Sequence, residues 1–300
     1  RALIAHGDRV TAVDLKSGAV TADFAAGSQI HTALPINDGQ QVLITNGATD
    51  TATIVNGKTG ALESTVPTGN RPDAATYDPS TKLVLVMDHK AGDITLIDTQ
   101  EHKAVGQIQI GGDLEEAAVD GDGRAYVTVE DKNEAVVIDI KGRTVVARYK
   151  LDACEGPTGI VFAPKEKQLI IACDGSAQVR TAKDGALVKN FAIGGGADGA
   201  AYDAADHLAF IPSGATGTLS VLAVDTKDPQ LIETVETQTG ARTIAFDAKT
   251  GRIYLPTAKF GAKPADGGRP PILPGSFEVL VVEKTGSIAS SAVMPSASKP

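Results

Sequence analysis

The 300-residue sequence contains no tryptophan, two methionines and two cysteines, and only 4% of its residues are aromatic. A hydrophobic core must therefore be built mainly from valine, isoleucine, leucine and alanine. The sequence has no apolar run of about 18 residues, so we expect no membrane-spanning helix. A helical period of about 3.6 residues is not sustained anywhere, which argues against a helical repeat.

The sequence also has fewer basic than acidic residues. The chain has 28 lysines and arginines against 37 aspartates and glutamates, for a formal net charge of -9. Because phosphate contacts need a basic surface, nucleic-acid binding fits poorly and is kept only as a third hypothesis. The chain begins at Arg1 without an initiator methionine, and the residues do not say whether a leader segment preceded it.

The sequence does contain a repeat that runs along the whole chain. Equivalent apolar residues stand at intervals of 41, 42, 43, 40 and 44 residues, at Ile36, Tyr77, Val119, Phe162, Tyr202 and Phe246. Each unit continues with short alternating or β-branched segments, such as 82–86 and 135–138, which are bounded by turn residues and indicate strands. A period in the forties with four short strands per unit predicts propeller blades.

Six units contain all four predicted strands, whereas the N-terminal piece supplies only strands two to four, at 2–5, 10–13 and 19–24. We therefore predict an all-β, single-domain, seven-bladed β-propeller with four antiparallel strands per blade. The approximate blades are 1–28, 29–69, 70–112, 113–154, 155–196, 197–240 and 241–294. We expect residues 287–293 to form the last strand of blade 7. Residues upstream of Arg1, or else the tail 292–300, would complete blade 1.

One connection is much longer than its equivalents. Residues 257–275, rich in glycine and proline, separate two predicted strands of the last blade. Loops of this length are usually functional or disordered. We expect an extended, lid-like loop beside the channel or, equally, partial disorder.

The repeats resemble those of the YVTN-type, YncE-like β-propellers of bacteria. The matching residues include 124–128 (RAYVT), 135–139 (AVVID), the looser variant 94–98 (ITLID) and Lys-Thr-Gly turns such as 58–60. The resemblance covers nearly the whole chain and implies a propeller that is exported with a signal peptide, hence periplasmic or secreted. That family shares no catalytic residues, so the resemblance implies no particular activity.

Function in a propeller is expected on the face where the blade-to-blade connections meet the channel. Aligning the first residues of the inner strands gives a series of six positions: Thr32, Asp73, Glu115, Thr158, Asp198 and Arg242. Beside them lie His31, Arg71, Glu116 and Glu155. We predict a ligand site at the channel mouth formed by His31, Arg71, Asp73, Glu115, Asp198 and Arg242.

Three acids of that series, Asp73, Glu115 and Asp198, could hold a calcium ion through oxygen ligands. They could instead form ordinary ion pairs with Arg71 and Arg242, which is the commoner role of such groups. Apart from calcium, no cofactor is expected.

Three histidines on neighbouring blades, His6, His31 and His89, suggest a transition-metal site or a general base. Equivalent positions in separate blades can be too far apart for one metal, and no local spacing pairs two ligands. Solvent-exposed histidines are therefore the default expectation.

The two cysteines fall within one blade. Cys154 precedes the first strand of blade 5 and Cys173 ends its second strand, so both are expected at the same face on antiparallel neighbours. A disulfide is therefore predicted, provided that the Cα atoms approach within about 7 Å. Two free thiols are the alternative.

These observations favour a non-enzymatic, monomeric scaffold that binds a small molecule or a protein through its channel face. The alternative is a calcium-dependent, lactonase-like hydrolase, in which paired acids and His31 polarise the substrate or activate water. Neither a phosphate-binding glycine loop ahead of a helix nor a Gly-x-Ser-x-Gly elbow occurs.

Overall fold

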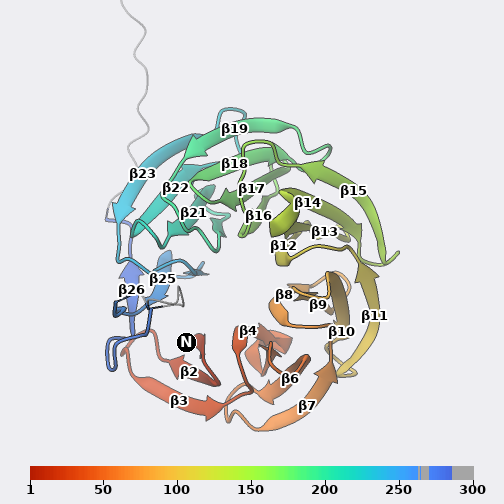
Figure 1. Ribbon diagram of the computed structural model, residues 1–300, viewed down its shortest axis with the longest axis vertical. Helices are drawn as coiled ribbons and strands as arrows, with labels where there is room; N and C mark the ends of the chain where they lie inside the picture. Colours follow the sequence, from red (N-terminus) through yellow and green to blue (C-terminus); the bar gives the residue numbers. More distant parts are fainter. Residues whose placement is uncertain (263, 265–269, 286–300) are drawn as a thin grey trace, which may run out of the picture.

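The computed structural model shows seven β-sheets arranged as blades around a central channel (Figure 1). It describes residues 1–262, 264 and 270–285. Within these residues, five sheets have four antiparallel strands and two have three. The predicted seven-bladed β-propeller is therefore confirmed.

The blades follow one another along the chain, each running from the channel outward in strand order. Blade 1 contains β1 (Ala2–His6), β2 (Arg9–Val13) and β3 (Val20–Ala25). Blade 2 contains β4 (Ile30–Ile36), β5 (Gln41–Asn46), β6 (Thr51–Asn56) and β7 (Leu62–Pro67). Blade 3 contains β8 (Pro72–Asp78), β9 (Leu83–Asp88), β10 (Asp93–Asp98) and β11 (Lys103–Gln109). Blade 4 contains β12 (Leu114–Val119), β13 (Arg124–Val129), β14 (Glu134–Asp139) and β15 (Thr144–Lys150).

The second half of the chain repeats the arrangement. Blade 5 contains β16 (Ile160–Ala163), β17 (Gln168–Cys173), β18 (Ser176–Thr181) and β19 (Leu187–Ala192). Blade 6 contains β20 (Ala201–Asp203), β21 (Leu208–Ser213), β22 (Thr218–Ala223) and β23 (Gln230–Glu236). Blade 7 contains β24 (Ala245–Asp247), β25 (Arg252–Thr257) and β26 (Glu278–Val282). Two 3₁₀ turns, η1 (Asn37–Gly39) and η2 (Glu130–Lys132), follow β4 and β13.

Both ends of the ring have three described strands. In blade 1 they are the three expected from the sequence, and β1 packs beside β4 of blade 2. The strand predicted at 287–293 and the tail 292–300 lie outside the described residues.

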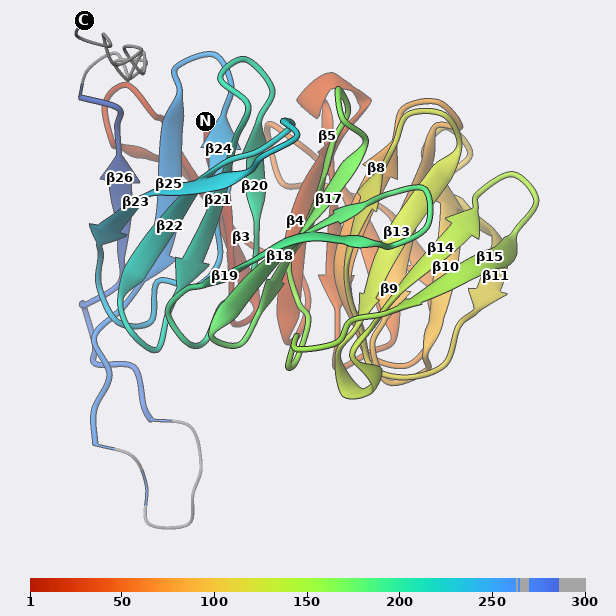
Figure 2. The same ribbon diagram turned by 90° about the horizontal axis from the view of Figure 1, so that it is seen from above.

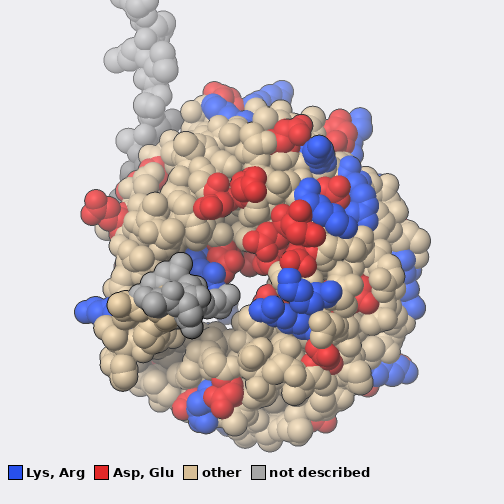
Figure 3. Space-filling view, viewed as in Figure 1, with Lys and Arg blue, Asp and Glu red and all other residues tan. Residues whose placement is uncertain are grey.

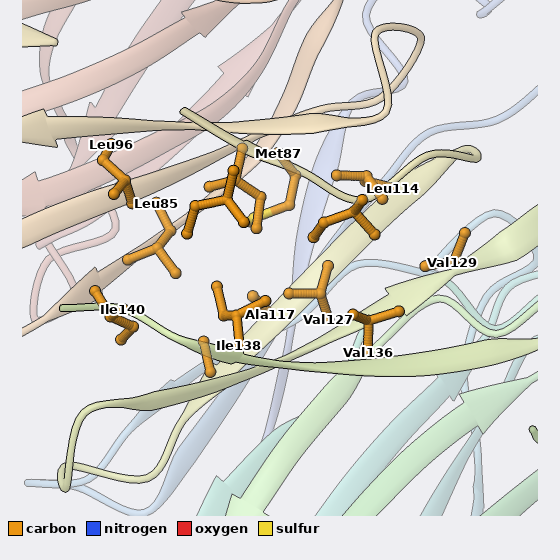
Figure 4. Close-up of a cluster of buried hydrophobic side chains, with 14 residues drawn as sticks. Leu85, Met87, Leu96, Leu114, Ala117, Val127, Val129, Val136, Ile138 and Ile140 are labelled. Atoms are coloured by element: carbon orange, nitrogen blue, oxygen red, sulfur yellow. The ribbon is translucent and has the colours of Figure 1, made fainter. Parts of the chain in front are cut away.

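The hydrophobic core lies between the blades, because strand alternation buries both faces of each sheet. Along β9, Leu85 and Met87 pack towards blade 4, whereas Val84 and Val86 pack towards blade 2. Figure 4 shows the first of these interfaces, in which side chains from the two sheets interdigitate. Each fully buried Leu, Ile or Met contributes roughly 1.5–3 kcal/mol.

The long connection after β25 projects from one face of the disc (Figure 2). Its two described arms are joined by an antiparallel bridge between Phe260 and Ile272. Both side chains are exposed, as is Phe277. No helix within the described residues has the length and apolar composition needed to cross a bilayer.

Candidate functional site at the channel mouth

The inner strands of blades 2, 3 and 4 each contain a β-bulge near their first residue. The pairing register shifts between Ile30 and Ala33 in β4, and equivalent shifts occur in β8 and β12. A bulge leaves one extra residue unpaired and turns side chains away from the regular sheet direction. The first bulged residue of each strand is His31, Asp73 and Glu115, at identical intervals along the chain.

In blades 2 and 4, a threonine hydroxyl opposite the bulge stabilises this geometry. In blade 2, the Thr45 hydroxyl accepts from the Thr32 amide (3.0 Å) and donates to the carbonyl of Asp73 in blade 3 (2.7 Å). In blade 4, the Thr128 hydroxyl donates to the carbonyl of Thr158 in blade 5 (2.6 Å). Side-chain bonds from one blade therefore fix the inner strand of the next.

The pairing of the first and second strands identifies the residue of blades 5 to 7 that is equivalent to the first bulged residue. The pairs that set this register are Ile160 with Ile171, Ala201 with Phe210, and Ala245 with Tyr254. We call the resulting set the inner ring: His31, Asp73, Glu115, Thr158, Asp198 and Arg242. The sequence alignment predicted this ring except in blade 2, where it chose Thr32 and the register places His31.

A second set of equivalent positions, here called the loop ring, is the first residue after the second strand of each blade. Its members from blade 2 to blade 7 are Gly47, His89, Glu130, Asp174, Gly214 and Ala258. Blades 3, 4 and 5 carry ionisable side chains in this ring, whereas the other three blades carry glycine or alanine.

The two rings meet at blades 3 and 4. One ligand atom each from Asp73, His89 and Glu115 lies within 4.8 Å of the other two. His89 Nδ1 is 3.1 Å from Glu115 Oε1 and 3.0 Å from the Leu114 carbonyl oxygen. The structure therefore brings together the side chains of Asp73 and Glu115, two of the residues named in the sequence analysis, and adds His89 to them.

His89 is buried, with 8% of its surface exposed, so the expectation of a solvent-exposed histidine is wrong at this position. Its other ring nitrogen, Nε2, lies 3.7 Å from Asp113 Oδ2. Lys90 Nζ is 2.5 Å from the same Asp113 oxygen and lowers the pKa of that carboxyl. The hydrogen bond to Glu115 raises the pKa of His89, with burial opposing it.

The remaining predicted residues occupy the edges of this cluster. His31 Nδ1 is 3.0 Å from Asp73 Oδ1, and Arg242 Nε is 3.2 Å from Asp198 Oδ2. Asp198 is not part of the group formed with His89. The backbone amide of Arg71 donates to Asp50 (2.8 Å), and its guanidinium acts on Asp73 only through charge. Asp73, Glu115 and Asp198 thus each have a basic partner, but only Asp198 is paired with one of the two expected arginines.

Glu116, the second bulged residue of β12, extends into the channel. The equivalent residues of blades 5 and 6 are Gly159 and Gly199, and the Glu116 carboxylate extends over them. An added Cβ at Gly199 would lie 3.6 Å from Glu116 Oε1. At Gly159, an added Cβ would lie 2.4 Å from the Gly199 carbonyl carbon. The missing side chains of blades 5 and 6 therefore let β16 and β20 approach closely and leave room for the Glu116 carboxylate.

Burial and mutual repulsion favour the protonated form of these acids. Burial first, and then the charge of Asp198, raise the pKa of Glu116 to about 8. Burial raises the pKa of Asp198 to about 6, although Arg242 opposes the shift. Burial also raises the pKa of Asp73 and of Glu130, and the charge of Glu115 adds to each. The mouth therefore holds closely spaced acidic groups that are costly to ionise together.

Figure 3 shows acidic side chains gathered along one side of the central hollow, on the face from which the long connection projects. A cavity of about 690 Å³ opens there beside blades 4 to 7. Its charged lining residues are Glu130, Asp131, Glu155, Asp174, Asp198 and Arg242. Deeper in the channel, a cavity of about 440 Å³ is lined by Glu116, Thr76 and Tyr202 among others.

Two further predicted sites fall elsewhere. His6 is exposed and contacts Thr11, at 2.8 Å from its hydroxyl, so it does not join His31 and His89. Cys154 and Cys173 are bonded to each other, with Cα atoms 5.3 Å apart, and both are buried. The disulfide ties the start of blade 5 to its second strand.

Sequence comparison identifies no relatives: no protein-family model and no curated protein matches the chain. Structure comparison does find similar propellers. A chain of hydrazine synthase from Kuenenia stuttgartiensis matches with a TM-score of 0.76 and 16% identity over 93% of this chain and 90% of that one. A chain of the mitotic checkpoint complex matches with a TM-score of 0.71 and 14% identity over 85% and 82%. At these identities the likeness shows the fold alone.

Proposed function

We propose that the protein is a binding scaffold that takes up a small cationic ligand at its channel mouth. The observation that carries this proposal is the lining of the mouth cavity, where Arg242 faces five carboxylates. Carboxylates with raised pKa are held close together at a cost, and a bound cation relieves their desolvation and repulsion. A rigid ring with a partly charged concave face suits binding more directly than a multistep reaction.

Spermidine, a small polycation, provides a direct test by thermal unfolding at low salt. We expect it to raise the melting temperature, because a ligand at 100 times its Kd stabilises the folded state by about 2.7 kcal/mol. The double variant Glu130→Gln/Asp198→Asn should lose this effect. Screening by added salt should weaken it in the parent protein.

A matched control removes two carboxylates far from the mouth. Asp206 and Glu283 are paired with Lys284 and Arg252 at the surface, so Asp206→Asn/Glu283→Gln changes the net charge equally. This control should respond to spermidine as the parent does. Equal loss in both double variants would show a nonspecific charge effect and overturn the proposal.

The hydrolase alternative keeps one supporting observation, the cluster of Asp73, His89 and Glu115. A hydrolase of the lactonase type needs a bound cation to polarise its substrate or activate water. Metal-dependent turnover of a simple lactone that is lost in Glu115→Gln would favour it over binding alone.

We also infer that the chain is an exported, YVTN-type propeller that acts as a monomer. The disulfide between Cys154 and Cys173 supports an oxidising compartment, because such bonds are rare in reducing cytosol. Fractionation of producing cells, followed by non-reducing thiol counting, tests the location: reduced protein in the cytosol would contradict it.

A further inference from the structure

We propose that Asp73, His89 and Glu115 form a binding site for one divalent transition-metal ion. The inference rests on the proposed uptake of a cation at the channel mouth and names its chemical class. The three side chains come from the bulge of β8, the loop after β9 and the bulge of β12, and their ligand atoms already lie within 4.8 Å of one another. Little rearrangement is needed to surround an ion.

The buried histidine is the second feature that points to a metal. His89 is more than nine-tenths buried, and its Nδ1 lies 3.1 Å from Glu115 Oε1. Two ligand atoms on one tetrahedral ion at about 2.1 Å each stand about 3.4 Å apart, so this pair needs to open by only about 0.3 Å. No hydrogen bond to Nε2 occurs within the described residues.

The surroundings of His89 place a carboxylate beside the ring nitrogen that would not bind the ion. With Nδ1 as the ligand atom, the ion would take the place of the proton between Nδ1 and the Leu114 carbonyl oxygen, which are 3.0 Å apart. The Nε2–H then faces the Asp113 carboxylate, whose Oδ2 lies 3.7 Å away, within the outer surroundings of a ligand histidine but beyond hydrogen-bond distance. Asp73 has a comparable outer partner, because His31 Nδ1 is 3.0 Å from its Oδ1. Ligands and supporting groups thus come from three consecutive blades.

The donor set selects the class of ion. Calcium takes six to eight oxygen ligands, whereas here a nitrogen stands among two carboxylates. Imidazole with carboxylate suits zinc and neighbouring transition metals. Three protein ligands also leave one coordination position for water or for a further ligand, and the side chains of Asp73 and Glu115 are partly exposed, at 27% and 16%. The calcium expected from sequence is therefore replaced in this proposal by a zinc-like ion.

The test uses the full chain after treatment with EDTA and dialysis. Titration calorimetry with Zn²⁺ should give one equivalent of tight binding, and Co²⁺ should produce visible absorption bands that Zn²⁺ abolishes. His89→Gln and Glu115→Gln should each weaken Zn²⁺ binding at least tenfold. His6→Gln removes an exposed histidine of blade 1 and should leave binding unchanged.

Three results would overturn the proposal: no Zn²⁺ or Co²⁺ binding by the parent at 100 μM, unchanged affinity in both ligand variants, or an equal loss in His6→Gln. Circular dichroism of the metal-free variants checks their folding. If His89→Gln does not fold, Asp73→Asn, at the most exposed of the three ligands, takes its place. Stabilisation by spermidine without metal binding would remove the metal and leave the proposed function standing, whereas failure of both would remove both.

Discussion

Blades 2 and 3 have the same strands in the same register, yet equivalent buried positions hold a neutral amide in one and a carboxyl in the other. At the end of the second strand, blade 2 has Asn46 paired with Thr51, and blade 3 has Asp88 paired with Asp93. Both second-strand residues are buried, at 1% and 0% exposure. A neutral amide therefore occupies a site in one blade that a carboxyl occupies in the next.

The contacts explain what each side chain requires. Asn46 Nδ2 donates to the Ile44 carbonyl at 3.2 Å, and its Oδ1 has no hydrogen-bond partner among the residues that the structure describes. In blade 3, Asp88 Oδ2 accepts from the Thr95 hydroxyl at 2.6 Å, while Oδ1 of Asp88 and Oδ1 of Asp93 find no partner in the described part of the chain. Burial raises the pKa of Asp88 to about 7, and the charge of Asp93 adds to the shift. The repeat tolerates the carboxyl best in its protonated form, which resembles the amide.

The two blades also differ at the channel mouth. Blade 2 has His31 in the inner ring and Gly47 in the loop ring, and an added Cβ at Gly47 would lie 3.2 Å from His31 Nε2. Blade 3 has Asp73 and His89 at these positions. Each blade therefore places one histidine at the mouth. Blade 2 has it in the inner ring, at His31, and blade 3 has it in the loop ring, at His89. A common scaffold places different ligands by exchanging residues between the two rings.

The largest effect is expected when the blade 3 chemistry is transferred to blade 2. Asn46→Asp puts a carboxylate against carbonyl oxygens that now accept from an amide, so it should cost about 3–5 kcal/mol of folding free energy at pH 8. Urea denaturation measures the loss. Asn56→Asp is the control, because Asn56 Oδ1 accepts two turn amides that a carboxylate also satisfies, and the bond that it loses, from Nδ2 to Glu63 Oε1, is exposed to solvent. A similar loss in both variants would contradict the comparison.

The reverse exchange, Asp88→Asn, should stabilise the protein above neutral pH. A carboxyl whose pKa rises from 3.8 unfolded to about 7 folded keeps its proton only in the folded state between those values. Its penalty is absent below about pH 4, grows through that window and is complete above pH 7, where it reaches at most about 4 kcal/mol. We expect a gain of about 2–4 kcal/mol at pH 8 and little change at pH 4.

Unfolding by urea at both pH values, with EDTA present to keep metals away from His89, measures this difference. Asp98→Asn is the control, because Asp98 is a turn residue whose pKa is lowered by the amides of Glu101 and Gln100. That variant should lose stability at pH 8. A gain for Asp88→Asn that does not depend on pH would show that the carboxyl is not the cause.

The repeat was readable from sequence because its intervals and strand patterns are regular, and it led directly to Asp73 and Glu115. In blade 2 the series was assigned to Thr32 instead of His31, because a bulge changes the pairing register without changing the composition. The exact interval of 42 residues between His31, Asp73 and Glu115 was the signal that could have corrected it. Two features could not be predicted: the burial of His89, and the pairing of Asp88 with Asp93 across neighbouring strands. Both depend on how neighbouring blades and strands pack.

The smallest effect is expected when one threonine hydroxyl is removed from either blade. Thr95→Val removes the donor to Asp88 Oδ2, whereas Thr53→Val removes a bond of 3.2 Å to the Ala26 carbonyl. A hydrogen bond to a charged group contributes about 1.5–3 kcal/mol and a neutral one about 1 kcal/mol. Thr95→Val should therefore cost more at pH 8 than at pH 5, while the cost of Thr53→Val should not change with pH. Urea unfolding of the double variant Asp88→Asn/Thr95→Val decides the cause: the pH dependence should vanish, and its persistence would mean that Thr95 acts through a group other than the Asp88 carboxyl.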